Sequence, residues 1–167
     1  GTGREDMAMS FEAEGPLDKL GWQILRVVQE DARLSFSEIG RRVGLSAPAV
    51  ADRVRRMEEL GVLTGYQATV DPTKLGYPNL AFVQLTVWSP ESYPEVEKLA
   101  RTLSEILECH HLTGSDTYLF KVIMSSNAHL ETVVATLGQY GQTKAEMVLS
   151  SPVRSKLVFG GPSVRFG

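Results

Sequence analysis

Residues 35–57 read SFSEIGRRVGLSAPAVADRVRRM, and this stretch decides the fold of the N-terminal part of the chain. Ser35 and Glu38 have the spacing of a capping box, which predicts that a short helix begins there. Gly44 then allows a chain reversal, because glycine adopts left-handed backbone angles at little cost. Ser46 is placed to cap the next helix. Two short helices joined by a glycine turn predict a helix-turn-helix.

Apolar spacing extends this unit in both directions. A preceding helix is expected from near Pro16 to about Glu30, because apolar residues recur there every three or four positions. The last helix is expected to run to about Leu60. Its packing side comprises Ala47, Val50, Val54 and Met57. One face of that helix is therefore expected to pack, while the other stays free.

The local charge of this unit differs from that of the whole chain. The 167 residues carry a formal net charge of -3. Between Arg33 and Arg56, however, six arginines face two acidic residues, whereas residues 76–150 hold eight acids and four bases. Such asymmetry indicates two modules with different partners.

The exposed side of the last two helices is the candidate nucleic-acid interface, with double-stranded DNA as the expected partner. Guanidinium groups within one helical turn suit phosphates or guanine edges, and a solvated charged face is the alternative. Phosphate contacts should supply most of the affinity. The candidate residues are Ser35, Arg41, Arg42, Ser46, Ala47, Pro48, Ala49, Asp52, Arg53, Arg55 and Arg56.

The C-terminal part alternates strand and helix patterns. Strands are expected at 79–88, 109–113, 117–124 and 144–151, with helices at 94–107 and 128–140. The order βαββαβ predicts a ferredoxin-like α+β domain. Two helices cover only one sheet face, so Phe82 and Trp88 require another cover. Either Leu119 and Ile123 or Tyr118, Phe120 and Val122 share that second face. A second copy of the chain is the simplest cover, which predicts a homodimer.

These patterns predict five segments. They are a flexible arm at 1–15, a helix-turn-helix domain at 16–62, a linker strand or wing at 63–77, an α/β domain at 78–159 and a tail at 160–167.

Other functional classes lack support in the sequence. A single cysteine, Cys109, cannot form an intrachain disulfide, which favours a reducing, cytoplasmic setting. The neighbours of Cys109, His110 and His111, alternate faces on a strand, so no metal site is expected. The uncharged run at 75–90 is too short for a membrane helix. No catalytic or cofactor motif is found, and neither an enzyme nor a cofactor is expected.

Several short motifs together resemble one known family. They are Leu17-Asp18, Asp31-Ala32-Arg33-Leu34-Ser35, Val43-Gly44-Leu45-Ser46, Arg53-Val54-Arg55-Arg56-Met57-Glu58 and Gly65-Tyr66. In order and spacing they resemble the Lrp/AsnC (feast/famine) transcriptional regulators over residues 17–159. The resemblance implies operator binding through the third helix. It also implies a homodimer or octamer and an amino-acid effector held between α/β domains.

The resemblance further implies an effector loop of the form G-x-x-D-Y. Residues 114–118 read Gly-Ser-Asp-Thr-Tyr, so threonine occupies the usual aspartate position. Asp116 replaces that carboxylate, or the ligand differs, or none binds; a plain β-turn is the alternative for the loop. The candidate effector residues are Thr113, Gly114, Ser115, Asp116, Thr117, Tyr118, Ser150 and Ser151. A DNA-organising architectural protein without an effector is the rival function.

Overall fold

The computed structural model of the chain describes residues 15–162, which divide into two compact units. Residues up to Ala68 form the first unit together with the segment from Val153 onward, and Thr69–Pro152 form the second. By contacts, the first unit therefore includes the chain again from Val153 onward. The expected arm, except Gly15, and the last five residues of the expected tail lie outside the described residues.

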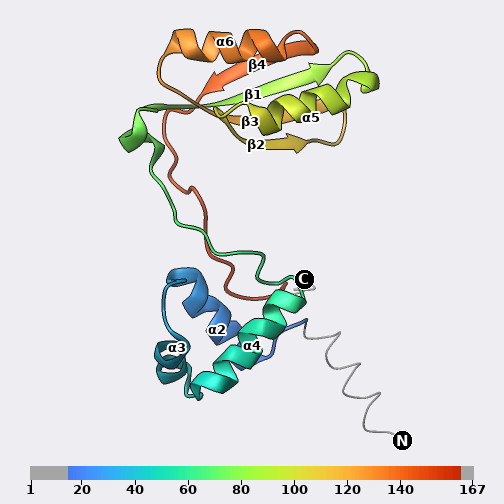
Figure 1. The fold of residues 1–167 in the computed structure, drawn as a ribbon. Helices are drawn as coiled ribbons and strands as arrows, with labels where there is room; N and C mark the ends of the chain where they lie inside the picture. Colours follow the sequence, from blue (N-terminus) through green and yellow to red (C-terminus); the bar gives the residue numbers. More distant parts are fainter. Residues whose placement is uncertain (1–14, 163–167) are drawn as a thin grey trace, which may run out of the picture. The chain divides into compact units, whose positions relative to one another are not determined.

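The first unit contains the three expected helices, α2 (Lys19–Glu30), α3 (Phe36–Val43) and α4 (Ala47–Glu59) (Figure 1). The side chain of each N-cap residue accepts a hydrogen bond from a backbone amide. These residues are Asp18 for α2, Ser35 for α3 and Ser46 for α4. The core of this unit consists of Ile24, Leu25, Val28, Ile39, Val50, Val54 and Met57. Apolar burial and caps thus explain the three helices together.

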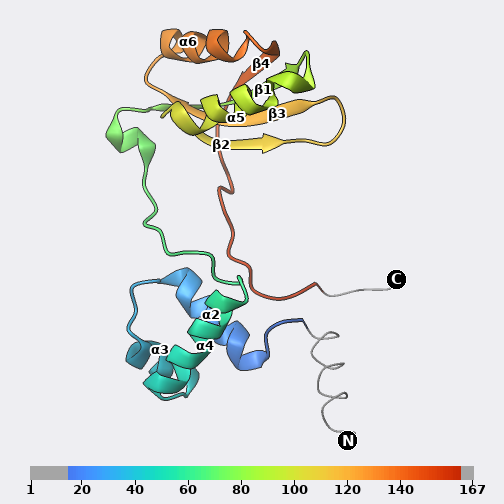
Figure 2. The same ribbon diagram turned by 45° about the vertical axis from the view of Figure 1, so that its right-hand side comes forward.

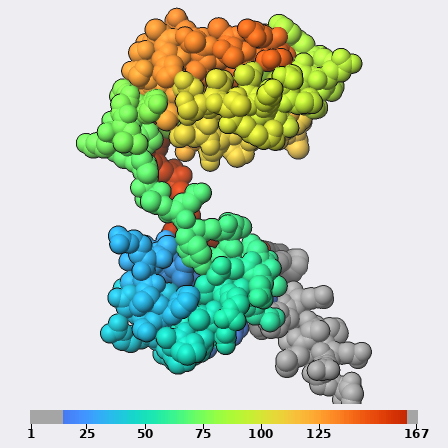
Figure 3. All heavy atoms as spheres, viewed as in Figure 1, coloured from blue at the N-terminus to red at the C-terminus, as the bar shows by residue number. Residues whose placement is uncertain are grey.

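The second unit is the expected βαββαβ domain. Its elements are β1 (Asn79–Val87), η2 (Pro90–Ser92), α5 (Tyr93–Thr102), β2 (Ile106–His111), β3 (Thr117–Met124), α6 (Asn127–Leu137) and β4 (Gly141–Met147). The four strands are antiparallel in the order β2-β3-β1-β4. The two helices α5 and α6 lie side by side on one face of this sheet (Figures 1 and 3).

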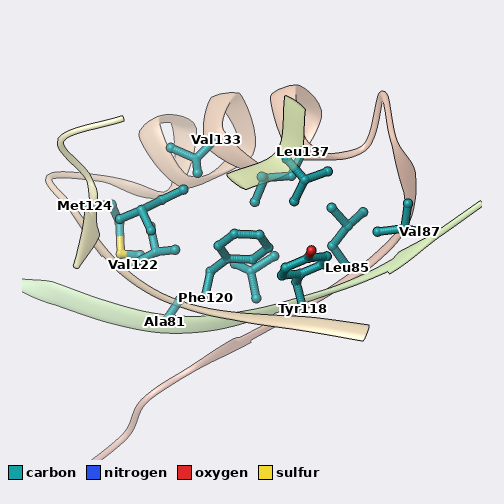
Figure 4. Packing of buried hydrophobic residues seen from close by; sticks show 12 residues of the cluster. Ala81, Leu85, Val87, Tyr118, Phe120, Val122, Met124, Val133 and Leu137 are labelled. Atoms are coloured by element: carbon teal, nitrogen blue, oxygen red, sulfur yellow. The ribbon is translucent and has the colours of Figure 1, made fainter. Parts of the chain in front are cut away.

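Strand register decides which side chains face those helices. Val83 pairs with Phe120 and Leu85 with Tyr118, and all four side chains are buried. Figure 4 shows Leu85, Tyr118 and Phe120 pointing toward Val133 and Leu137 of α6. The sequence analysis left open which of two sets of β3 side chains faces the helices. The set containing Tyr118, Phe120 and Val122 faces the helices, so Leu119 and Ile123 lie on the other face.

Several element boundaries differ from expectation, including the helix expected at 128–140, which ends at Leu137, and the strand expected at 109–113, which spans Ile106–His111. The helix expected at 94–107 ends at Thr102, because Ile106 instead begins β2 and pairs with Val122. The last strand begins at Gly141 and ends at Met147, before Ser150 and Ser151. The expected linker strand is absent: residues 64–71 have no regular secondary structure, and the 3-10 helix η1 (Pro72–Leu75) follows. A β-leaning segment needs a partner strand, and the described chain pairs none with it.

Candidate functional site

The turn between α3 and α4 requires glycine at two positions. Gly44 has φ 77°, in the left-handed region, as its sequence position indicates. The amides of Gly44 and Leu45 both donate to the carbonyl oxygen of Gly40, at 2.8 and 2.9 Å. A Cβ atom at Gly40 would collide with the carbonyl oxygen of Leu45. The backbone therefore approaches α3 at Gly40 as closely as glycine permits.

The three arginines near the end of α4 have different surroundings. A side-chain nitrogen of Arg53, Nη1, lies 2.8 Å from Oδ1 of Asp18, the residue that caps α2. This guanidinium, with the Gly21 amide, holds the pKa of the Asp18 carboxyl below its usual value. Arg55 lies 3.5 Å from Asp52, and both side chains are largely exposed. Arg53 thus connects α4 to α2, whereas Arg55 faces solvent.

Four guanidinium groups remain exposed on α3 and α4. They belong to Arg41, Arg42, Arg55 and Arg56. Within residues 15–162, only Arg55 of these four forms an ion pair, and that pair is a weakly held surface contact. Unpaired, solvated guanidinium groups remain available to phosphates.

The remaining candidates begin the two helices. The Ser35 and Ser46 hydroxyl oxygens accept hydrogen bonds from the amides of Glu38 and Ala49, at 3.1 and 3.3 Å. Pro48 and Asp52 are exposed, while Ala47 and Ala49 are half-buried. The serines therefore shape the helix starts first, and their hydroxyl hydrogens remain available as donors.

The loop between β2 and β3 contains two residues with positive φ. Gly114 has φ 108° and Asp116 has φ 51°. Open space surrounds Gly114, since a Cβ atom there would meet nothing within 4 Å. The Tyr93 hydroxyl donates to Asp116 at 2.5 Å, and the Thr117 hydroxyl lies 3.3 Å from that of Thr86. The loop therefore presents an exposed glycine beside a carboxylate that α5 holds in place.

Tyr118 belongs to the core rather than to the exposed part of this loop. Its side chain is 1% exposed, and its hydroxyl donates to Glu97 at 3.1 Å. Burial, followed by the Glu97 carboxylate, raises the pKa of Tyr118 to about 12. The ring stacks on His111 at 4.2 Å between centroids. Thr113, Ser115 and Asp116 are exposed, so they present the polar groups of the loop.

The two groups of candidate effector residues lie at opposite ends of the sheet within one chain. Thr117 pairs with Thr86 near the end of β1, whereas Met147, the last residue of β4, pairs with Ala81 near its start. Ser150 and Ser151 follow Met147. At about 3.4 Å per residue, five positions along β1 span about 17 Å. The structure therefore does not bring Ser150 and Ser151 to the loop of the same chain.

The Cys-His-His sequence on β2 divides between the two sheet faces. Cys109 pairs with Phe120 and His111 with Tyr118, on the side of the helices, and His110 pairs with Leu119 on the opposite side. Burial raises the pKa of the half-buried Cys109 thiol. No helix among residues 15–162 is long and apolar enough to cross a membrane.

Two side-chain hydrogen bonds, Arg53 to Asp18 and Tyr93 to Asp116, were not found from sequence patterns. Asp18 stands directly before a helix, so its capping role had a signal. Its bond to Arg53 had none, because the two residues are 35 positions apart. The bond between Tyr93 and Asp116 likewise joins residues 23 positions apart.

The fold and these surfaces define a helix-turn-helix DNA-binding protein with an appended α+β domain. The AsnC-type helix-turn-helix domain matches residues 17–58, and the Lrp/AsnC ligand binding domain matches residues 80–158. The HTH-type transcriptional regulator LrpC of Bacillus subtilis is 32% identical over 134 residues, 80% of this chain and 92% of that protein. The regulatory protein AsnC of Haemophilus influenzae is 32% identical over 120 residues, 72% of this chain and 80% of that protein.

Solved structures agree. Bacillus subtilis LrpC superimposes with a TM-score of 0.78 and 31% identity, covering 85% of this chain and 100% of that one. Escherichia coli AsnC superimposes with a TM-score of 0.75 and 27% identity, covering 85% of this chain and 98% of that one. The chain belongs to the Lrp/AsnC family of transcriptional regulators. It is a DNA-binding regulator and not an enzyme, and its second unit is a ligand-binding domain of that family.

Proposed function

We propose that α4 contacts operator DNA and that an amino acid or related small molecule, bound to the second unit, controls this contact. The observation that carries the first part is the set of exposed guanidinium groups on α3 and α4. They flank a helix whose orientation is determined by the glycine turn. Phosphates would meet Arg41, Arg42, Arg55 and Arg56, while the first turn of α4 would approach the bases.

The arginines give the sharpest test of this interface. Arg55→Ala and Arg56→Ala are each expected to weaken binding to all DNA sequences and to reduce the slope of log affinity against log salt by about 1. Each substitution removes one phosphate contact and its counterion release. Affinities for operator and mixed-sequence duplexes at several salt concentrations would measure the change.

Arg101→Ala is the matched control, because this arginine is exposed on α5 of the other unit. For the Arg101→Ala variant, the slope of log affinity against log salt should equal that of the wild type. If both α4 variants also kept the wild-type affinity and slope, the DNA-contacting face would lie elsewhere.

The loop at 113–117 is the proposed effector contact. The family's second domain is a ligand-binding domain, and a relative from Klebsiella pneumoniae, 37% identical over 107 residues, is named the leucine-responsive regulatory protein. Gly114 offers space and free backbone amides for a carboxylate. Asp116, held by Tyr93, offers a charge for an ammonium group. If Ser150 and Ser151 also contribute, they must come from another copy of the chain.

Filling this space tests the effector proposal. Gly114→Trp is expected to abolish amino-acid binding, measured by calorimetry against the common amino acids, while DNA binding without effector persists. Gly65→Trp is the control, since Gly65 also has open space and lies in the first unit. Wild-type protein that bound no common amino acid, or a Gly114→Trp variant with full binding, would favour the architectural alternative.

The open face of the sheet is the proposed dimer interface. Its apolar side chains are Leu80, Phe82, Leu119 and Ile123, and Ile123 is already buried within one chain. Lys121 and Glu146 flank Phe82 on the neighbouring strands. A twofold-related copy would meet this face with the same apolar side chains and charges of both signs. The family resemblance extends this proposal to an assembly of dimers into an octamer.

A further inference from the structure

The segment from Val153 to Gly161 makes its contacts with the helical unit, although residues up to 158 fall within the matched ligand binding domain. It has no regular secondary structure and many of its side chains are exposed, including Val158 and Phe159. Figures 1 and 2 show this C-terminal segment beside the helical unit. Residues 69–152 are thus bounded on both sides by segments that pack in the first unit.

Gln29 on α2 holds this segment by two hydrogen bonds. Its Nε2 donates to the carbonyl oxygen of Val158 at 2.7 Å, and its Oε1 accepts from the amide of Val158 at 2.9 Å. The carboxamide thus satisfies both backbone groups of Val158, as a neighbouring strand would. Such a pairing fixes the position of the segment along α2 as well as its distance from it.

Two further contacts extend the attachment along the same helix. The Arg26 guanidinium lies 5.0 Å from the centre of the Phe159 ring, within cation-π range. A Cβ atom built on Gly161 would lie 3.7 Å from Cζ2 of Trp22. Positions 22, 26 and 29 form one stripe on α2, because their spacings are four and three residues. The buried residues Ile24 and Val28 lie on another side of the helix.

We infer that residues 153–161 form a strap, locked to α2 by Gln29, which gives the ligand-binding domain a second mechanical connection to the DNA-binding unit. The first connection is the chain from Leu63 to Tyr77, which enters the ligand-binding domain. With the strap attached, both ends of that domain are anchored to the helical unit. With the strap released, only one end is anchored. The strap therefore reduces the conformational freedom that must be lost when a dimer places two helix-turn-helix units on DNA.

Amide exchange tests the attachment in the full-length chain. Gln29→Leu removes both hydrogen bonds and is expected to accelerate exchange of the Val158 amide about tenfold, measured by NMR. Gln29→Glu keeps an acceptor for the amide but loses the donor, so a smaller acceleration is expected. Gln23→Leu is the control, because Gln23 is exposed on the same helix. Unchanged exchange of Val158 in Gln29→Leu would overturn the attachment.

DNA affinity tests the connection. Gln29→Leu and a chain ending at Pro152 are expected to bind a mixed-sequence duplex about threefold to tenfold more weakly. The salt slope of Gln29→Leu should stay that of the wild type, because no phosphate contact is removed. Accelerated Val158 exchange in Gln29→Leu, together with wild-type DNA affinity in Gln29→Leu and in the chain ending at Pro152, would refute the mechanical role. A reduced salt slope in Gln29→Leu would overturn it in favour of direct DNA contact.

Discussion

Gly40→Ala is expected to unfold the helix-turn-helix at its turn and to abolish DNA binding. The added methyl group would collide with the carbonyl oxygen of Leu45, an atom that cannot move without breaking the turn. Overpacking alone costs about 1–3 kcal/mol, and here the obstacle is backbone. The expected loss in free energy of unfolding is therefore about 3 kcal/mol or more, a large share of the stability of a small domain.

The chain provides a separate optical reporter for this experiment. Its two tryptophans are Trp22 and Trp88, one in each unit. In a Trp88→Phe background, urea unfolding followed by Trp22 fluorescence reports on the helical unit alone. Gly65→Ala is the control, since Gly65 has open space around it. A Gly40→Ala protein as stable as this control would refute the assigned turn geometry.

Phe82→Asp is expected to convert the proposed dimer into monomers. Phe82 lies on the open sheet face between Lys121 and Glu146, so an interface there would lose its apolar ring and bury an added carboxylate in its place. Losing one apolar interface residue costs about 2 kcal/mol, and a twofold interface contains each substitution twice. A total of about 4 kcal/mol corresponds to a dissociation constant on the order of 1,000-fold higher. Light scattering across a concentration series would measure it.

Leu149→Asp is the matched control, because this leucine is 99% exposed and lies beyond β4. The mass of the Leu149→Asp protein in solution should equal that of the wild type. Near-ultraviolet circular dichroism would confirm that the Phe82→Asp protomer keeps its core, which faces the helices. A wild-type chain that is monomeric at micromolar concentration, or a Phe82→Asp protein that remains dimeric, would exclude this face as the interface.

Local signals predicted most of the fold. The capping box at Ser35, the left-handed Gly44 and the alternation along β1 each depend on residues close together in the chain, and the structure contains all three. The boundaries of α5 and β2 were wrong. Leu103 and Ile106 continue the helical spacing, but pairing of Ile106 with Val122 stabilises a strand instead. Tertiary pairing overrode the local pattern there.

The candidate sites were predicted less completely, because side-chain roles depend on distant partners. The pattern on α4 places Arg53 and Arg56 together, whereas Asp18 pairs with Arg53 alone. Tyr118 follows the effector loop in sequence, yet strand alternation turns its ring into the core. Neither outcome is encoded in the spacing of the motif itself.

The strap also sets an order of events during synthesis. Gln29 and Val158 are 129 residues apart, so α2 is made long before the segment that binds its outer stripe. At about 5–20 residues per second, that interval is on the order of ten seconds. The helix-turn-helix can form in this time, but its attachment must wait for the whole ligand-binding domain to emerge. A chain terminated before Val158 thus yields a DNA-binding domain without this attachment to α2.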